Sequence, residues 1–202
     1  MTTSARKVLN VGGNSKDIPI PHYYQDFEHL LLDIDPKGNP DVLCDARELD
    51  QRPGDEFDAI YCSHNLEHYY WHDVARVLKG FLHSLKPGGM VDIRVPDLQA
   101  VFDAMKSKNI GLNDPLYNSA VGPIAPIDVI YGWRQELETS GNDFFAHKTG
   151  FNQKTLRDVV KAAGLSFVFD VKTGAVYEAH VIAFKGRPDP IFVERLKLSG
   201  VS

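Results

Sequence analysis

The sequence predicts an α/β fold: a doubly wound, mostly parallel sheet of seven strands that ends in an antiparallel hairpin. Short apolar runs in the first half of the chain stop at glycine, proline or aspartate turns, as buried strands do. Residues 66–85 then switch to apolar residues at helical spacing. Near the C-terminus, two β-rich runs are separated by a four-residue turn. Alternating strands and helices are typical of a parallel sheet with helices on both faces.

The seven expected strands are short and apolar. They are residues 7–11, 29–33, 41–44, 57–62, 90–95, 165–171 and 176–184. Pro19 and Pro21 allow at most a short helix between the first two strands. The last two strands form the closing hairpin, an antiparallel pair at the sheet edge.

Three helices are expected. The first carries the apolar stripe of residues 66–85, with Lys86 in its last turn and the Pro-Gly-Gly of residues 87–89 as its stop. The second covers residues 98–106. The third starts after Asn152 as N-cap and runs to Ala163. Residues 98–150 as a whole do not repeat the strand-helix pattern, and we interpret them as a substrate-side lid or insertion within a single domain of residues 1–202.

Composition excludes several classes of protein. The 202 residues carry 22 Lys and Arg against 27 Asp and Glu, a net charge of −5, which does not favour nucleic acid as a partner. No apolar run is long enough to span a membrane, and the N-terminus lacks a signal peptide pattern. Two cysteines make no disulfide framework. We therefore expect a soluble, single-domain protein of a reducing compartment, the cytoplasm, that is a monomer or a homodimer.

Polar and glycine residues follow the first four strands. In an open parallel sheet, these strand ends border the ligand crevice. Gly12, Gly13 and Asn14 suit a turn where backbone approaches a ligand closely. Asp33 ends the second strand, 21 residues after Gly12, where a carboxylate can accept hydrogen bonds from ribose hydroxyls. Asp35 is the alternative ribose ligand.

The next two strands end in further candidates. Asp45 follows the third strand, where an adenine amino group could be held, and Ser63 and His64 end the fourth strand at the same crevice. Cys44 and Cys62 are interpreted as buried strand residues with unreactive thiols.

Together these segments resemble the class I S-adenosylmethionine-dependent methyltransferases, in particular the type 11-like members. The resemblance rests on VLNVGGN at 8–14, LDIDP at 32–36, DAREL at 45–49, FDAIYCSHNLEH at 57–68 and LKPGGM at 85–90. It covers about residues 8–95 and resumes at residues 147–185, beginning with HKTGF. Departures from the family pattern are Asn10, where an acidic residue is frequent, and Asn14 and Lys16 in place of loop glycines.

The resemblance implies a Rossmann-like methyltransferase fold and S-adenosyl-L-methionine as cofactor. By position, Gly12 would contact the methionine part of the cofactor. Asp33 and the following residue, Ile34, would contact its ribose. Asp45 and Ala46 would flank the adenine, and Ser63 and His64 would border the sulfonium and the acceptor.

The implied activity is transfer of a methyl group to a small-molecule or glycan-type acceptor by in-line displacement. A hydroxyl acceptor needs a base, for which His64, His147 and Asp97 are the candidates in that order. The aromatic residues Tyr117, Tyr131 and Trp133 either wall a substrate pocket or form a minor core.

Three alternatives remain open. The chain can be a catalytically inactive, cofactor-binding partner protein, or a nicotinamide-dependent oxidoreductase that lacks the full G-x-G-x-x-G. It can also be a zinc hydrolase, because His64 to His68 match H-x-x-E-H and His72 follows four residues later. We expect no metal, since His68 and His72 fall opposite the apolar stripe and no further ligand is evident.

Overall fold

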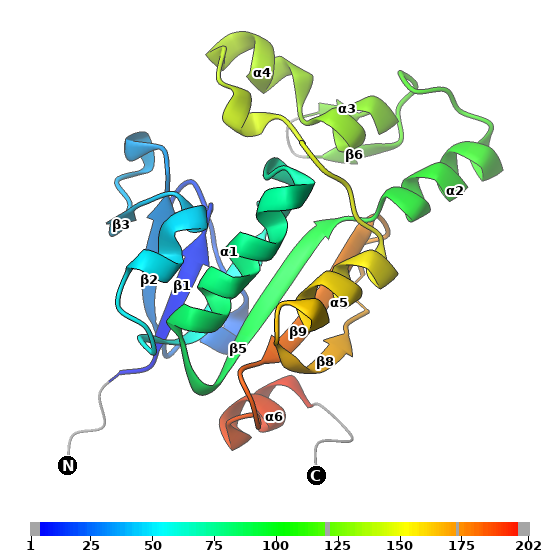
Figure 1. The fold of residues 1–202 in the computed structure, drawn as a ribbon. Coiled ribbons are helices and arrows are strands. Elements are labelled where there is room, and N and C mark those ends of the chain that lie inside the picture. The colour runs from blue at the N-terminus through cyan, green and yellow to red at the C-terminus, as the bar shows by residue number, and fades with distance from the viewer. Residues whose placement is uncertain (1–4, 120–121, 173, 198–202) are drawn as a thin grey trace.

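A seven-stranded sheet forms the centre of the computed structural model, which describes residues 5–119, 122–172 and 174–197 (Figure 1). The strand order is β3-β2-β1-β4-β5-β9-β8. Neighbouring strands among β1 to β5 pair in parallel, whereas β9 lies antiparallel between β5 and β8. The strands are β1 (Lys7–Val11), β2 (Glu28–Asp33), β3 (Val42–Leu43), β4 (Phe57–Ser63), β5 (Leu85–Pro96), β8 (Ser166–Asp170) and β9 (Glu178–Phe184). The predicted fold class is confirmed. Of the two strands of the closing hairpin, β8 lies at the sheet edge and β9 lies inside the sheet.

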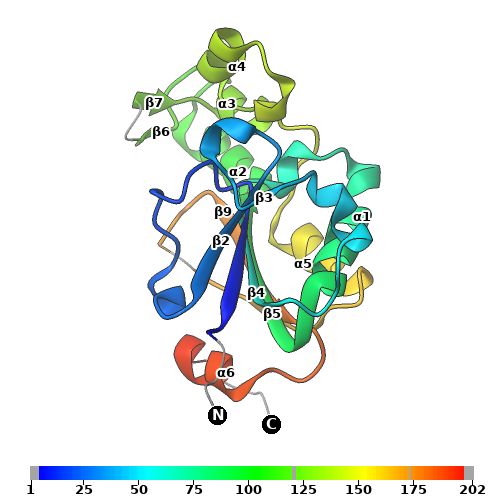
Figure 2. The same ribbon diagram turned by 90° about the vertical axis from the view of Figure 1, so that its left-hand side faces the viewer.

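One face of the sheet is covered by helices α1 (Trp71–Ser84) and α5 (Gln153–Ala162) and by the 3-10 helix η3 (Ala46–Gln51) (Figures 1 and 2). Their apolar residues pack with those of the strands into the largest hydrophobic core. Asn152 caps α5 as expected, since its side chain accepts a hydrogen bond from the Thr155 N–H. Burial of these helix faces fixes the sheet from one side.

The opposite face has a thinner cover. It consists of the 3-10 helix η1 (His22–Tyr24), Phe27, and helix α6 (Pro190–Leu196), packed on Val8, Ala59 and Met90. The two prolines before η1 explain why no α-helix forms between β1 and β2.

Three details of the helix predictions are wrong. The connections among β1, β2, β3 and β4 hold the 3-10 helices η1, η2 (Pro36–Gly38) and η3, so strands do not alternate with α-helices there. The expected helix over residues 66–85 is interrupted at its start, because Leu66 lies in a separate 3-10 turn, η4 (Leu66–His68), and α1 begins at Trp71. Its end is early as well, because Leu85 adopts an extended backbone and pairs with Phe57, which places Lys86 in β5.

The insertion forms a separate layer at the end of the sheet to which the parallel strands point (Figure 1). Its elements are α2 (Leu98–Lys108), β6 (Tyr117–Ser119), β7 (Gly122–Ile124), α3 (Pro126–Tyr131), α4 (Arg134–Ser140) and η5 (Asp143–Phe145). Val101, Leu116 and Val129 form its small core. At Gly132, φ is +98° and a Cβ would lie 2.2 Å from the Phe145 carbonyl oxygen, so a glycine lets α3 and η5 meet.

Among the described residues, no helix combines the length and the apolar character that crossing a membrane requires.

Candidate active site

A cavity of about 420 Å³ opens at the carboxyl ends of β1, β2 and β4. Neighbours β2 and β4 lie on opposite sides of β1, so this is the point where the strand order reverses. Open α/β sheets bind ligands at this point, and the volume suits a small molecule. Six predicted cofactor residues line the cavity: Gly12, Asn14, Asp33, Ile34, Asp45 and His64.

Gly12 lets the turn after β1 approach the turn after β4. Its φ is +70°, a left-handed conformation that favours glycine. A Cβ atom here would lie 2.0 Å from Asn65 Nδ2. The Gly12 N–H also donates to the Leu32 carbonyl at 2.8 Å, which fixes the turn to β2. Any larger residue would have to move the turn out of this position.

Asp33 ends β2 with its carboxylate held in place. Oδ2 accepts the Asn14 N–H at 3.1 Å and Oδ1 accepts the Asp35 N–H at 2.9 Å. Each oxygen keeps a further lone pair, so the carboxylate can still accept two hydroxyl hydrogen bonds. Ile34 beside it is 40% exposed and offers an apolar surface. This acceptor set fits the two hydroxyl groups of a ribose.

Asp45 is engaged by its neighbour Arg47. The carboxylate accepts the Arg47 backbone N–H at 2.9 Å, which caps η3, and the guanidinium at 2.6 Å and 2.9 Å. Burial alone would raise the pKa of Asp45, but the bonds from Arg47 outweigh it and hold the pKa below its ordinary value. Arg47 also reaches Asp73 at 3.3 Å. Part of the hydrogen-bonding capacity predicted for an adenine is therefore used inside the protein.

His64 lies between two carboxylates in a strained backbone conformation. Its φ is +51°, and half of its side chain is exposed. Nε2 lies 3.3 Å from Glu178 Oε2 and Nδ1 lies 3.6 Å from Glu67 Oε1. Burial would lower the pKa of His64, but the two carboxylates outweigh it and raise the pKa to about 10. A doubly protonated ring has no lone pair to act as a base.

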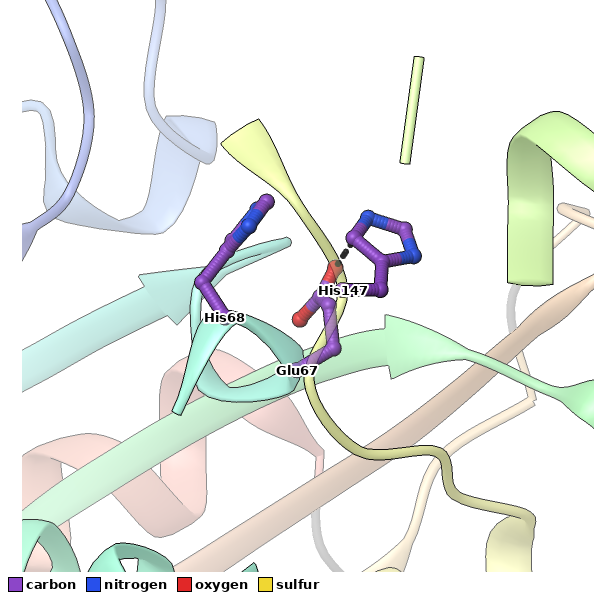
Figure 3. Close-up of side chains that lie close together, drawn as sticks. All are labelled: Glu67, His68 and His147. Carbon is purple, nitrogen blue, oxygen red and sulfur yellow. Dashed lines mark ion pairs between the residues drawn. The ribbon is translucent and has the colours of Figure 1, made fainter. Parts of the chain in front are cut away.

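Glu67, His68 and His147 form a second polar cluster beside the cavity (Figure 3). Glu67 is 2% exposed at its side chain, and neither carboxylate oxygen accepts a hydrogen bond. Burial would raise the pKa of Glu67, but His64 beside it holds the pKa below its ordinary value. His147 Nε2 lies 3.9 Å from Glu67 Oε1, and the two imidazole rings meet edge to face at 4.9 Å.

The insertion supplies another wall of the cavity. Asp143, Phe144, Phe145 and Lys148 line it, and the Lys148 N–H donates to the Glu67 carbonyl at 2.8 Å. This backbone bond ties the end of the insertion to the turn after β4. None of the aromatic residues predicted as candidate pocket walls is among the lining residues; those residues are Tyr117, Tyr131 and Trp133.

Other predicted residues lie away from the cavity wall. Gly13 packs on Asn10, and Ala46 is buried at the start of η3. Ser63 ends β4 without lining the cavity. Asp97 caps α2 by accepting the Ala100 N–H at 3.2 Å, which accounts for its position structurally.

His147 also lies outside the cavity wall, packed beside Glu67 and His68. The prediction for His68 is wrong, because it is half-buried in η4 rather than solvated on α1, whereas His72 is exposed as expected. Both cysteines are free thiols, and Cys62 is fully buried, which raises its pKa.

Known proteins share this architecture. Residues 25–93 match the family model of the methyltransferase domain. The predicted resemblance to class I S-adenosylmethionine-dependent methyltransferases is confirmed. A methyltransferase of Archaeoglobus fulgidus superimposes with a TM-score of 0.55 at 15% identity, covering 90% of this chain and 87% of that one. A methyltransferase of Mesorhizobium loti gives 0.53 at 18% identity, with 89% and 91% covered.

A further match is a Pyrococcus horikoshii protein, with a TM-score of 0.57, 16% identity, and 89% and 82% of the two chains covered. Some similar structures are longer: the chain spans 49% of a carbon methyltransferase that it matches. These likenesses concern the methyltransferase fold. No curated protein sequence matches the chain significantly.

Several cavity residues of this methyltransferase fold are not among the sequence predictions. The strand-end rule points to the turn after β4, and it could have found Asn65 and Tyr69. No local signal marks Phe144 or Phe145, because their position depends on how the insertion folds back onto the sheet.

Proposed function

We propose that the chain is an S-adenosylmethionine-dependent methyltransferase that acts on a small-molecule or glycan-type acceptor. The observation that carries the proposal is the pairing of Gly12 and Asp33 in one cavity at the reversal point of the sheet. The match of residues 25–93 to a methyltransferase domain supports it. We further propose a cytoplasmic enzyme that works as a monomer or homodimer, in keeping with its two free cysteines.

The cavity residues fit the parts of this cofactor. Asp33 would accept the ribose hydroxyls, with Ile34 against the adjoining ring. Gly12 would leave room for the methionine part beside the turn after β1. Asp45 would meet the adenine amino group with the capacity that Arg47 leaves free.

The bound cofactor supplies a methyl group on a positively charged sulfur, which an in-line nucleophile displaces. The chain must align the acceptor with that methyl group and keep water out. Phe144 and Phe145 contribute apolar surface to the wall of the cavity. Among the three candidate bases, only His64 lines the cavity.

His64 is placed to hold an acceptor rather than to take its proton. Its two ring nitrogens face the carboxylates of Glu67 and Glu178, which raise the pKa of His64 to about 10, so both nitrogens carry protons. Lys148 adds a cation to the wall from the insertion. These donors favour a polar acceptor with anionic or hydroxyl groups.

The test is formation of S-adenosylhomocysteine from S-adenosylmethionine with a panel of hydroxylated, anionic and sugar-like acceptors. We expect product with at least one acceptor class and a lower rate for His64→Ala. Cofactor binding without product across the panel would favour the inactive partner protein. Binding of a nicotinamide cofactor in its place would favour the oxidoreductase.

A further inference from the structure

Glu67, His68 and His147 bring three metal-ligating side chains together in a way that no local sequence pattern predicts. One ligand atom from each lies within 4.8 Å of the others. Glu67 and His68 come from the turn after β4, and His147 comes from the segment that follows η5 (Figure 3). The pattern H-x-x-E-H suggested His64 and His68 with Glu67, whereas the structure exchanges His64 for His147.

The Nδ1 atom of each imidazole bonds to a backbone carbonyl, and this bond orients the ring. His68 Nδ1 lies 3.1 Å from the Ala146 carbonyl oxygen, and His147 Nδ1 lies 2.8 Å from the Val129 carbonyl oxygen. A carbonyl oxygen only accepts, so Nδ1 of each ring carries a proton, and in the neutral form of each ring Nε2 carries the lone pair that a metal binds. Metal-bound histidines show this same anchoring of the second nitrogen.

The Glu67 carboxylate lies close to His147 and has no hydrogen bond of its own. His147 Nε2 lies 3.9 Å from Glu67 Oε1, and neither Glu67 oxygen accepts a hydrogen bond. Such a buried carboxylate is costly unless a cation compensates it. His64 at 3.6 Å compensates it from one side, but it also has Glu178 as a partner.

We propose that Glu67, His68 and His147 bind a divalent transition-metal ion such as Zn²⁺. Two imidazoles and one carboxylate are a zinc-type ligand set, whereas Mg²⁺ and Ca²⁺ prefer oxygen ligands. Tetrahedral coordination at zinc distances puts ligand atoms about 3.3 Å apart. The three ligand atoms lie within 4.8 Å of one another, so each separation needs to shorten by at most about 1.5 Å.

The site leaves a coordination position open. Three protein ligands with a free fourth position are typical of catalytic rather than structural zinc sites. His68 is itself a wall of the cavity, so a ligand in the cavity can reach that position. The inference does not depend on the proposed methyl transfer, because metal binding is measured without cofactor or acceptor.

The experiment is calorimetric titration of chelator-treated full-length protein with Zn²⁺ alone, and with Mg²⁺ alone for comparison. We expect one equivalent of Zn²⁺ to bind and Mg²⁺ not to compete. His147→Ala and Glu67→Gln should each weaken Zn²⁺ binding at least tenfold, whereas His72→Ala, at an exposed histidine outside the cluster, should bind as the wild type does.

A second measurement keeps the inference testable if a variant fails to fold, which circular dichroism will reveal. Co²⁺ added to the wild-type protein should give the intense visible bands of a four- or five-coordinate site, and Zn²⁺ should abolish them. Binding well below one equivalent, equal affinity in folded His147→Ala, or loss of binding in His72→Ala would overturn the assignment. A six-coordinate Co²⁺ spectrum like that of the free ion would overturn it as well.

Discussion

At the scale of single residues, the surroundings decide which carboxylate can serve a ligand. Asp33, Asp35 and Asp45 all line the cavity. Asp45 is bonded to a guanidinium, and Asp35 accepts the Lys37 N–H at 2.9 Å as the cap of η2. Asp33 and Asp35 both accept backbone N–H groups, but among these three only Asp33 accepts one at each oxygen, which orients the carboxylate and leaves further lone pairs available.

Replacing Asp33 with Ala should therefore weaken binding of S-adenosylhomocysteine by at least about 1 kcal/mol, roughly a fivefold or larger loss in affinity. Asp35→Ala is the matched control and should change affinity less. Isothermal titration calorimetry measures both. If Asp35→Ala shows the larger loss, the ribose contact belongs to Asp35.

A second residue-scale prediction concerns Asp92 on β5, which is fully buried. Its carboxylate accepts from His180 at 2.7 Å and from Tyr23. Removing one partner of a buried pair typically costs 3–5 kcal/mol, so Asp92→Asn should lower the free energy of unfolding by about 3 kcal/mol. Urea denaturation measures the change.

Asp103→Asn, at an exposed position on α2, is the control and should stay within about 0.5 kcal/mol of the wild type. Equal stability of the two variants would show that the Asp92 bonds add little.

Some site residues could be predicted from the sequence, whereas the charge state of His64 could not. Gly12 and Asp33 were predictable because strand ends in a parallel sheet meet at a known edge. The preference of His64 for the protonated state was not, because it depends on Glu178, which is more than a hundred residues away along the chain.

At the scale of elements, the insertion turns an open strand-end crevice into a walled cavity. The length and irregular pattern of residues 98–150 predicted a lid or insertion. They did not predict the two short helices α3 and α4 or the antiparallel pair of β6 and β7. The residues that reach the cavity belong to η5 and to the segment after it. Which aromatic residues line the cavity depends on long-range packing. The sequence prediction named Tyr117, Tyr131 and Trp133, whereas Phe144 and Phe145 line it.

Phe144→Ala should weaken binding in the cavity without unfolding the protein. Phe144 is 42% exposed and lines the cavity, so its ring contributes more to the wall than to the core. We expect a fewfold lower affinity for S-adenosylhomocysteine or a lower rate of methyl transfer, with the unfolding midpoint changed little. Tyr131→Ala, at an exposed aromatic outside the cavity wall, is the control. If Tyr131→Ala lowers affinity and the rate of methyl transfer as well, the effect belongs to the insertion as a whole and not to Phe144.

At the scale of the whole molecule, the two faces of the sheet differ. Two α-helices cover one face, whereas η1, Phe27 and α6 give the other a thinner cover. The mostly parallel sheet and the closing antiparallel hairpin were predicted from the pattern of apolar runs, whereas no strand order was predicted. The absence of α-helices from the early connections was only partly predictable, because Pro19 and Pro21 act on the first connection alone.

The buried Asp92 cluster on the thinner face should make stability depend on pH. Burial would raise the pKa of Asp92, but His180 and Arg94 outweigh it and hold the pKa below its ordinary value. A carboxyl with a lower pKa in the folded state stabilises the protein above its unfolded pKa of about 3.9 and loses this contribution as the pH falls through the folded value. Urea unfolding between neutral pH and about pH 3 should show the loss in the wild type and a shallower one in Asp92→Asn.

The central claim is that the cavity at the reversal point of the sheet binds an adenosyl-sulfur cofactor. Calorimetric titration of the purified chain with S-adenosylhomocysteine, and separately with NAD, tests it most directly. We expect S-adenosylhomocysteine to bind at one equivalent and NAD to give no binding signal. Binding of NAD with no response to S-adenosylhomocysteine, or silence with both, would contradict the claim.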